Sequence, residues 1–253
     1  MLIAQITDTH ILARDSGHPA REWRAECLRR CVADINRHQP DAVLFTGDTV
    51  QHGKAEEYAC LRELLAELDA PLYLIPGNRD DNETLRSVFD DRSYLPASGD
   101  SLHYTVEDYD LRLVAIDSTA KGERKGVFCP ARQSWLDSVL GEQPDRPTLL
   151  FIHHPPFDID DHYIGGYRRQ EEADALTELV GRHAQVETML CGHVHCPGER
   201  DWAGTLARFM PSVAVDLRKG IDETEAQEQP IYMLHRYSAE SGFVSEQRRI
   251  NAA

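Results

Sequence analysis

Histidine, aspartate and asparagine side chains follow five short apolar runs of this 253-residue chain, each within a few residues of the end of a run. Short apolar runs of this kind are typical of buried β-strands. In an open α/β sheet the carboxyl ends of the strands meet at one edge, where such folds place ligands. The side chains concerned are Asp8, His10, Asp48, Asn78, His153, His193 and His195.

Each of these residues alone has an explanation that needs no chemistry. Asp48 and Asn78 each follow a glycine, and such pairs are common in turns. His153 could be a hydrogen-bonded core histidine, and the spacing of His193 and His195 could be chance. Their conjunction at strand ends indicates a site, because accidents would not place four of the twelve histidines there together.

The residue types point to metal ions. Carboxylate, carboxamide and imidazole ligands suit Mn²⁺, Fe²⁺, Zn²⁺ or Co²⁺, and the sequence does not choose among these metals. Seven ligands are too many for one tetrahedral ion, but they suit two divalent ions about 3.5–4 Å apart that share a carboxylate. Such a pair polarises a phosphoryl oxygen and converts a bound water to hydroxide. The pattern therefore predicts metal-assisted hydrolysis of a phosphoester.

Read in order, the residues form the series Asp-x-His, Gly-Asp, Gly-Asn-Arg-Asp, His and Gly-His-x-His. This series resembles the calcineurin-like metallophosphoesterase superfamily. The resemblance implies an α/β (α+β) fold, a four-layer αββα sandwich in which two mixed β-sheets are flanked by helices. It also implies a first metal held by Asp8, His10 and His195, a second metal held by Asn78, His153 and His193, and Asp48 as the bridge between them.

Neighbouring residues narrow this resemblance. Gln51 stands where purple acid phosphatases have a tyrosine ligand, and Gly47–Gly53 departs from the Gly-Asp-x-Val-Asp-Arg-Gly run of protein phosphatases. The short chain and His153–Pro156 look most like bacterial class III phosphodiesterases, which include cyclic-nucleotide phosphodiesterases and glycerophosphodiesterases. The resemblance thus implies hydrolysis of a small phosphodiester by a metal-bound hydroxide. The alternatives are a phosphomonoesterase, a nucleotide pyrophosphatase, or a catalytically silent protein-binding scaffold.

Arg79 departs from the family pattern, which has histidine after the asparagine. Arginine stays charged near neutral pH and cannot act as a general acid. It can hold phosphate oxygens through paired hydrogen bonds, so Arg79 is a candidate substrate clamp. The alternative is an ion pair with Asp80 or Asp81. The leaving group would then take its proton from His154 or from a metal-bound water, or would need none.

Three further residues could touch the substrate. His52 follows Asp48 closely and could reach the site or face solvent. Tyr163 and Arg168 lie in a polar loop after the His153 strand, which could wall the pocket or be an exposed connector. The predicted catalytic residues are Asp48, Asn78, Arg79 and His154.

The elements that must position these residues follow from periodicity. Strands are expected at Leu2–Ile6, Ala42–Thr46, Leu72–Ile75, Leu111–Ile116, Thr148–Ile152, Val186–Leu190, Leu206–Met210, Ser212–Leu217, Ile231–His235 and Gly242–Arg248. Amphipathic helices are expected at Arg21–His38, Ala55–Asp69, from Pro130, and at Gln170–His183. The order βαβαβ followed by mostly strands predicts a single domain over residues 1–253, with residues 213–236 as a candidate dimerisation or cap arm.

The charge limits the partners. Lys and Arg number 27 against 43 Asp and Glu, which gives a formal net charge of −16. This acidity argues against binding of long nucleic acids, because their phosphates are bound by Lys and Arg. It does not exclude a small phosphate ester, because bound cations dominate a metal site locally. No apolar stretch approaches the roughly 18 residues of a membrane span.

The six cysteines are expected to be free thiols rather than disulfides. The chain shows no secretory signal at its start, and it is far longer than small disulfide scaffolds. These features predict a cytoplasmic location. The resemblance adds a homo-oligomer, dimer or higher, as an expectation, because relatives often associate through their C-terminal strands.

Overall fold

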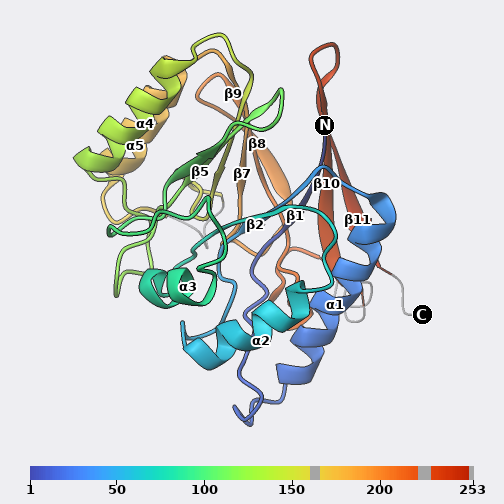
Figure 1. The fold of residues 1–253 in the computed structure, drawn as a ribbon. Coiled ribbons are helices and arrows are strands. Elements are labelled where there is room, and N and C mark those ends of the chain that lie inside the picture. The colour runs from blue at the N-terminus through green and yellow to red at the C-terminus, as the bar shows by residue number, and fades with distance from the viewer. Residues whose placement is uncertain (160–165, 222–228, 251–253) are drawn as a thin grey trace.

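Two β-sheets lie face to face, with helices on both outer sides, in the computed structural model, which describes residues 1–159, 166–221 and 229–250 (Figure 1). Sheet 1 contains, in spatial order, β11 (Gly242–Arg249), β10 (Ile231–Ser238), β1 (Leu2–Ile6), β2 (Ala42–Thr46) and β3 (Leu72–Ile75). Sheet 2 contains β4 (Tyr104–Val106), β5 (Arg112–Ile116), β6 (Thr148–Ile152), β7 (Val186–Cys191), β9 (Thr205–Phe209) and β8 (Gly198–Trp202). Both sheets mix parallel and antiparallel pairs, so the expected four-layer sandwich is confirmed.

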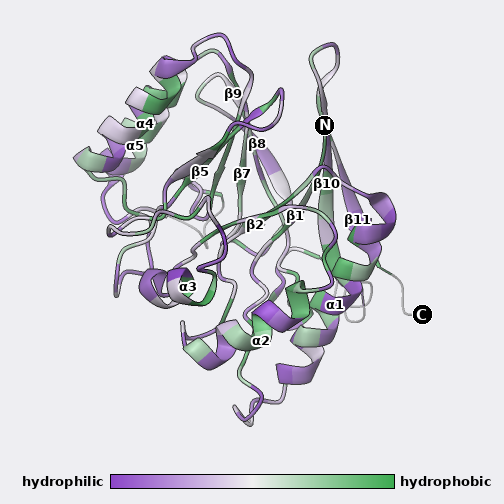
Figure 2. Ribbon diagram, viewed as in Figure 1, coloured by the Kyte–Doolittle hydropathy of each residue, from purple (hydrophilic) through white to green (hydrophobic). Residues whose placement is uncertain are grey.

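Helices cover the two outer faces. Their bounds are α1 (Arg21–His38), α2 (Ala55–Leu65), α3 (Asn82–Val88), α4 (Pro130–Glu142) and α5 (Gln170–Gly181), with a 3-10 turn η1 at Val215–Leu217. In Figure 1, α1 and α2 lie on the side of sheet 1, and α4 and α5 lie on the side of sheet 2. Hydrophobic and hydrophilic segments alternate along α1 and α4 in Figure 2, as amphipathic helices require.

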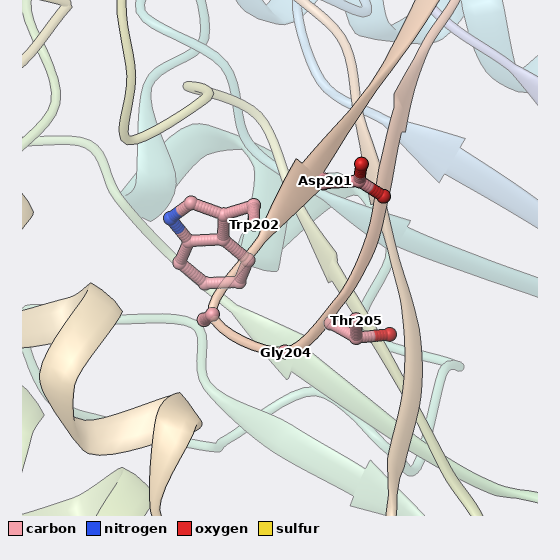
Figure 3. Close-up of a pocket in the computed structure, with 5 residues that line it drawn as sticks. Asp201, Trp202, Gly204 and Thr205 are labelled. Atoms are coloured by element: carbon pink, nitrogen blue, oxygen red, sulfur yellow. The ribbon is translucent and has the colours of Figure 1, made fainter.

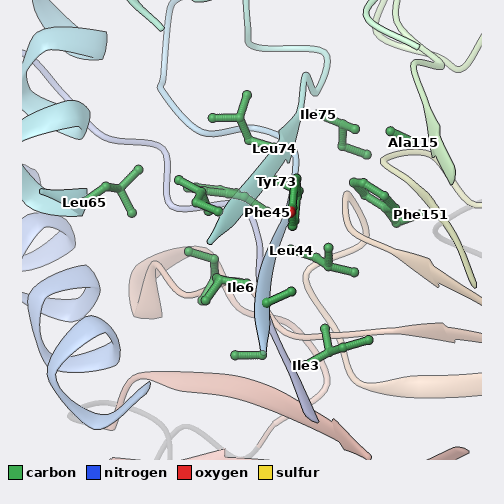
Figure 4. Close-up of a cluster of buried hydrophobic side chains, with 14 of the residues drawn as sticks. Ile3, Ile6, Leu44, Phe45, Leu65, Tyr73, Leu74, Ile75, Ala115 and Phe151 are labelled. Atoms are coloured by element: carbon green, nitrogen blue, oxygen red, sulfur yellow. The ribbon is translucent and has the colours of Figure 1, made fainter. Parts of the chain in front are cut away.

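The core fills both the space between the sheets and the space beneath the helices. Ala115 of β5 and Phe151 of β6 belong to the cluster that contains Leu44 and Ile75 of sheet 1 (Figure 4). Val114, the neighbour of Ala115, instead packs in the cluster beneath α4 and α5. Successive side chains of a strand point to opposite faces, so strands covered on both sides must be apolar throughout.

One expected strand is wrong. Residues Ser212–Leu217 form an irregular segment that ends in η1, although their apolar residues suggested a strand. Val213 and Ala214 are buried, but the Val213 N–H donates to the Thr7 carbonyl oxygen at the end of β1 rather than to a sheet neighbour. The segment is apolar because it packs on the strand ends.

Other boundaries shift by smaller amounts. Helix α2 ends at Leu65 rather than Asp69, because the Ala66 N–H bonds to the Glu63 oxygen in a tight final turn. Helix α5 ends at Gly181 rather than His183. The short elements α3, β4 and β8 were not expected. Tyr163 and residues 222–228 of the candidate arm lie outside the described residues.

Two further expectations concern the whole chain. All six cysteines carry free thiols, as expected. Among the described residues, no helix combines the length and the apolar composition that crossing a bilayer requires.

Candidate metal centre

The carboxyl ends of the parallel strands of both sheets meet at one place. Asp8 and Asp48 follow β1 and β2, while His153 and His193 follow β6 and β7. Direct hydrogen bonds join the sheets here, since the His193 N–H donates to Asp8 Oδ2 over 2.9 Å. We call Asp8, His10 and His195 the first group. We call Asn78, His153 and His193 the second group.

The first group converges on one point. His195 Nε2 lies 3.0 Å from Asp8 Oδ1, and His10 Nε2 lies 3.4 Å from His195 Nε2. Two imidazole nitrogens bound to one tetrahedral ion at about 2.0–2.1 Å would be about 3.4 Å apart. The donor atoms of these three residues and of Asp48 all lie within 4.8 Å of one another. The arrangement therefore matches the ligand set of one ion.

Asp48 faces both groups. Its Oδ2 atom lies 3.5 Å from His10 Nε2, and its Oδ1 atom lies 3.5 Å from His153 Nε2. One carboxylate thus offers one oxygen to each side, which is the geometry that a bridging ligand needs.

In the second group, hydrogen bonds fix which imidazole nitrogen is available. His153 Nδ1 lies 2.7 Å from the Thr46 carbonyl oxygen, which can only accept, so Nδ1 carries the proton. His153 Nε2 is then the free lone pair, and it lies 3.2 Å from His193 Nδ1. Holding the second imidazole nitrogen on a carbonyl is how proteins commonly orient histidine ligands.

The imidazoles of His153, His154 and His193 lie together here, and Asn78 is the predicted oxygen ligand of the second group. Its Oδ1 atom is buried and has no hydrogen-bond partner within the described ranges. A buried acceptor without a partner costs about 1–3 kcal/mol, so Oδ1 fits a position in which a cation supplies the missing interaction. The preceding residue, Gly77, packs directly against the His153 ring and Asp48.

The electrostatics also call for cations. Burial raises the pKa of Asp48 well above its usual value, and the charges of Asp8 and Asp80 raise it further. Burial alone would raise the pKa of Asp8 too, but His195, His153 and His10 lower it. In the described part of the chain, no Lys or Arg side chain pairs with either carboxylate. Divalent ions would supply the missing positive charge, so the residues present fit a metal pair.

The backbone is left-handed at most of the candidate ligands. Seven non-glycine residues of the described ranges have positive φ: Asp8, His10, Gln39, Asp48, His193, His195 and Ala203. Five of the seven are predicted metal ligands. Such conformations are unfavourable outside glycine, and they gather where surrounding structure enforces them at functional sites.

Two glycines let the strand ends approach each other this closely. A Cβ atom on Gly77 would collide with the backbone nitrogen and Oδ1 of Asp48. A Cβ atom on Gly192 would collide with Thr7 Oγ1 and lie 2.6 Å from the Thr46 oxygen. These positions must be glycine for steric reasons.

Asp80 holds the turns that carry Asp48 and Asn78, a role that sequence reasoning missed. Its carboxylate accepts hydrogen bonds from the Thr49 N–H at 3.0 Å, the Gly77 N–H at 2.8 Å and the Tyr58 hydroxyl at 3.0 Å. The available signal was its position two residues after Asn78 within a glycine-containing turn.

Arg79 makes no ion pair with its acidic neighbours. Its N–H donates to Asp48 Oδ1 over 2.7 Å. Its half-buried guanidinium has no hydrogen bond or ion pair with any residue that the structure describes. Asp80 is occupied as above, and Asp81 caps α3 by accepting from the Thr84 N–H. The alternative in which Arg79 pairs with Asp80 or Asp81 is therefore wrong.

His154 is buried beside the second group. Its ring centroid lies 4.5 Å from that of His193. Its Nδ1 atom lies 2.8 Å from Ser118 Oγ, and its Nε2 atom lies 3.3 Å from the Arg124 oxygen. Burial, followed by the neighbouring imidazoles of His193 and His153, lowers its pKa well below the usual value. A neutral imidazole with both nitrogens engaged is a poor proton donor.

The remaining predicted contacts lie at the edges of this region. His52 is half exposed, and its Nδ1 atom lies 2.8 Å from Glu57 Oε1. Arg168 pairs with Glu172 at 3.2 Å. Arg168 follows Tyr167, whose hydroxyl donates to the backbone carbonyl oxygen of His154. The loop that carries Arg168 therefore contacts His154, which lies beside the second group.

A surface hollow at the β8–β9 turn does not belong to the centre. It is lined by Asp201, Trp202, Ala203, Gly204 and Thr205 (Figure 3). Thr205 begins β9, which runs parallel to β7. The hollow is therefore at the amino ends of these strands, opposite the edge that carries His193.

Comparison with known proteins places the chain in a family. The family model for calcineurin-like phosphoesterases matches residues 1–197. A probable glycerophosphodiester phosphodiesterase of Arcobacter nitrofigilis is 34% identical over 251 residues, which cover 97% of this chain and 92% of the relative. A probable cyclic nucleotide phosphodiesterase of Rhodopseudomonas palustris is 35% identical over 210 residues, which cover 81% of this chain and 75% of the relative.

Among solved structures, a dimetal phosphatase from Danio rerio superposes with a TM-score of 0.69. It covers 100% of this chain and 99% of its own, at 16% identity, so it shows the fold alone. The family match and the relatives together settle the class. The protein is an enzyme of the calcineurin-like phosphoesterase family, and phosphodiesterases are its relatives over most of its length.

Proposed function

We propose that the protein is a dinuclear-metal phosphodiesterase that hydrolyses small phosphodiesters. The observation that carries this proposal is Asp48, whose two oxygens face the first and the second group separately. A site for one ion would not need a carboxylate between two converging sets of donors.

In this proposal the first group and the second group each hold one divalent ion, drawn from Mn, Fe, Zn or Co. When bound, such a pair supplies Lewis acidity toward the phosphoryl oxygen and makes water nucleophilic near neutral pH. The protein supplies orientation. Thr46 fixes the tautomer of His153, and the Arg79 N–H fixes the rotation of Asp48. Preset ligands lose little freedom when the ions bind.

We assign substrate binding first to the Arg79 guanidinium. It is charged, next to a metal ligand, and without a partner in the described ranges. It can therefore donate to phosphate oxygens and stabilise charge that develops in the transition state. His52, Arg168 and Tyr163 stay predictions as substrate-binding residues. The geometry favours His154 as a residue that orients the second group rather than as the acid.

The substrate class is proposed from the relatives and from the charge. The relatives named above act on glycerophosphodiesters and on cyclic nucleotides according to their names. The net charge of −16 disfavours long nucleic acids but not a small ester that is bound at a cationic centre. A phosphomonoester or a nucleotide pyrophosphate is the alternative substrate. The cytoplasmic location, the homo-oligomer, the single domain and the arm stay predictions.

The test is a substrate panel in the presence of Mn²⁺. Chelator-treated protein should be inactive, and Mn²⁺ should restore hydrolysis of bis(p-nitrophenyl) phosphate. Cyclic nucleotides, glycerophosphodiesters and aryl phosphomonoesters then rank the substrates. Faster hydrolysis of the monoesters would favour the alternative activity, and no hydrolysis of any ester with Mn²⁺ or Co²⁺ would remove the proposal.

A separate substitution tests the role of Arg79 as a substrate clamp. Arg79→Ala should lower both kcat and kcat/KM, by about 100-fold or more, because one lost donor to transition-state charge costs about that much. Arg37→Ala is the matched control, since Arg37 lies in the last turn of α1 with its side chain 76% exposed. Kinetics of Arg79→Ala that equal those of the control would refute the clamp.

A further inference from the structure

The segment 212–219 touches two of the three ligands of the first group directly. Ser212 Oγ donates to the backbone carbonyl oxygen of Asp8 over 2.7 Å. His195 Nδ1 donates to the Leu217 oxygen over 2.9 Å, and the Lys219 N–H donates back to the His195 oxygen over 3.0 Å. The segment thus sets both the position of Asp8 and the ring orientation of His195.

Arg24 of α1 ties this segment to the third ligand. The Arg24 side chain is buried and forms a two-nitrogen pair with Asp216 of η1, with Nη2 at 2.7 Å from Oδ2 and Nε at 3.1 Å from both oxygens. Its Nη1 atom donates to the His10 oxygen at 3.2 Å and to Gln51 Oε1 at 2.8 Å. One guanidinium therefore joins three separate parts of the chain.

The hydrogen bonds that orient the second group come from other parts of the chain. His153 is anchored on the Thr46 carbonyl oxygen of β2, and the Asn78 turn is anchored on Asp80. The printed hydrogen bonds from the segment 212–219 to candidate ligands go to Asp8 and His195 of the first group, while the Lys219 charge lowers the pKa of His193. A change in the segment should therefore affect the two groups unequally.

We propose that Arg24 is a positioning residue for the first metal ion, acting through Asp216 and the His10 carbonyl oxygen. This role rests on the proposed function, since it presupposes that the centre binds metal. The physical reason is that His10 and His195 both have left-handed backbone, with φ of 45° and 59°. Such conformations persist only when the surroundings enforce them, and the Arg24 contacts hold both neighbouring segments.

The test is calorimetric titration of chelator-treated protein with Mn²⁺, with wild type, Arg24→Met and Arg112→Met compared. Arg112 is the matched control, because it is also a buried arginine paired with a carboxylate, Glu107, but lies at the amino end of β5. Loss of an outer partner of a metal ligand lowers affinity by about 10–100-fold. Arg24→Met should show this loss for one of two ions, and Arg112→Met for neither.

Two double variants identify which of the two ions Arg24→Met weakens. With His153→Ala, which damages the second group, Arg24→Met should still weaken the remaining strong site by about 10–100-fold. With His195→Ala, which damages the first group, Arg24→Met should change nothing more, because coupled residues are non-additive. If Arg24→Met fails to fold, Asp216→Asn replaces it, since Asp216 is partly exposed and tolerates the change better.

The outcomes separate the two claims. Two tight ions in wild type and in both Arg24→Met and Asp216→Asn would overturn the positioning role alone. Equal weakening of both ions would also overturn it, because the role is specific to the first group. A wild-type protein that binds fewer than two Mn²⁺ ions would overturn the dinuclear function, and the positioning role with it.

Discussion

The two groups of ligands differ in where their support comes from. The second group is held by the sheets themselves, through Thr46 of β2 and through the turn that Asp80 fixes. The first group is held by parts of the chain outside the two sheets, namely α1 through Arg24 and the segment 212–219. One centre thus combines a site built into the sheet with a site completed by the rest of the fold.

Backbone strain shows why the first group needs that support. All three residues of the first group have positive φ, whereas in the second group only His193 does. Each such residue costs about 1–3 kcal/mol, which other contacts must offset. The difference suggests that ions at the two positions respond to different mutations, and this can be tested from the largest effect to the smallest.

Removing the bridge should disable both groups. Asp48→Asn keeps the shape of the side chain but removes one acceptor oxygen and the charge shared between the groups. Metal catalysis contributes several kcal/mol, so kcat/KM for bis(p-nitrophenyl) phosphate should fall about 1000-fold. Steady-state kinetics with metal analysis of the purified variant measures this. Retention of two ions and near-normal kinetics would contradict the bridging role.

Weakening the sheet-built site is the next largest effect. Asp80→Asn replaces an oxygen that accepts N–H and O–H groups with an amide nitrogen that cannot accept. Buried donors without acceptors cost about 1–3 kcal/mol, so the free energy of unfolding should fall by about that amount. The ion of the second group should weaken more than the ion of the first.

Denaturant unfolding and Mn²⁺ titration measure the two effects. The control is Asp34→Asn, since Asp34 also accepts a buried tyrosine hydroxyl, that of Tyr232, but lies on α1 away from the centre. If Asp80→Asn and the control bind Mn²⁺ at the second group with equal affinity, Asp80 does not support that group and the proposed difference between the groups is contradicted.

The smallest effect should come from a single contact between the segment 212–219 and the first group. Ser212→Ala removes the hydrogen bond to the backbone carbonyl oxygen of Asp8, which is worth about 1 kcal/mol, so the affinity for the first-group ion should fall about fivefold. Ser245→Ala is the control, because Ser245 Oγ bonds to His235 on the far strands. If Ser212→Ala lowers the Mn²⁺ affinity of the second group more than that of the first, Ser212 does not belong to the support of the first group.

Sequence patterns predicted the sheet-built parts best. Strands buried on both faces must be apolar along their length. This pattern predicted the strands Ala42–Thr46 and Thr148–Ile152 with the bounds that the structure shows. The polar residues directly after them then located the centre. The seven-residue helix α3 is too short to show periodicity, although Asp81 at its start is a typical cap.

The support of the first group from outside the sheets could not be predicted in the same way. Arg24 lies on the face of α1 that carries Cys27, Leu28 and Cys31, and a charged residue on an apolar face was the available signal. Its partner Asp216 is 192 residues away, and no local pattern links them. Left-handed φ at Asp8 and at the other ligands is imposed by packing, and the only trace in the sequence is that Asp and His adopt it more readily than most residues.

The central claim is a pair of metal ions bridged by Asp48. The most direct measurement is anomalous diffraction from crystals grown with Mn²⁺. Two peaks about 3.5–4 Å apart are expected, one against Asp8, His10 and His195 and the other against Asn78, His153 and His193, with Asp48 between them. A single peak, or peaks that share no carboxylate, would contradict the dinuclear centre.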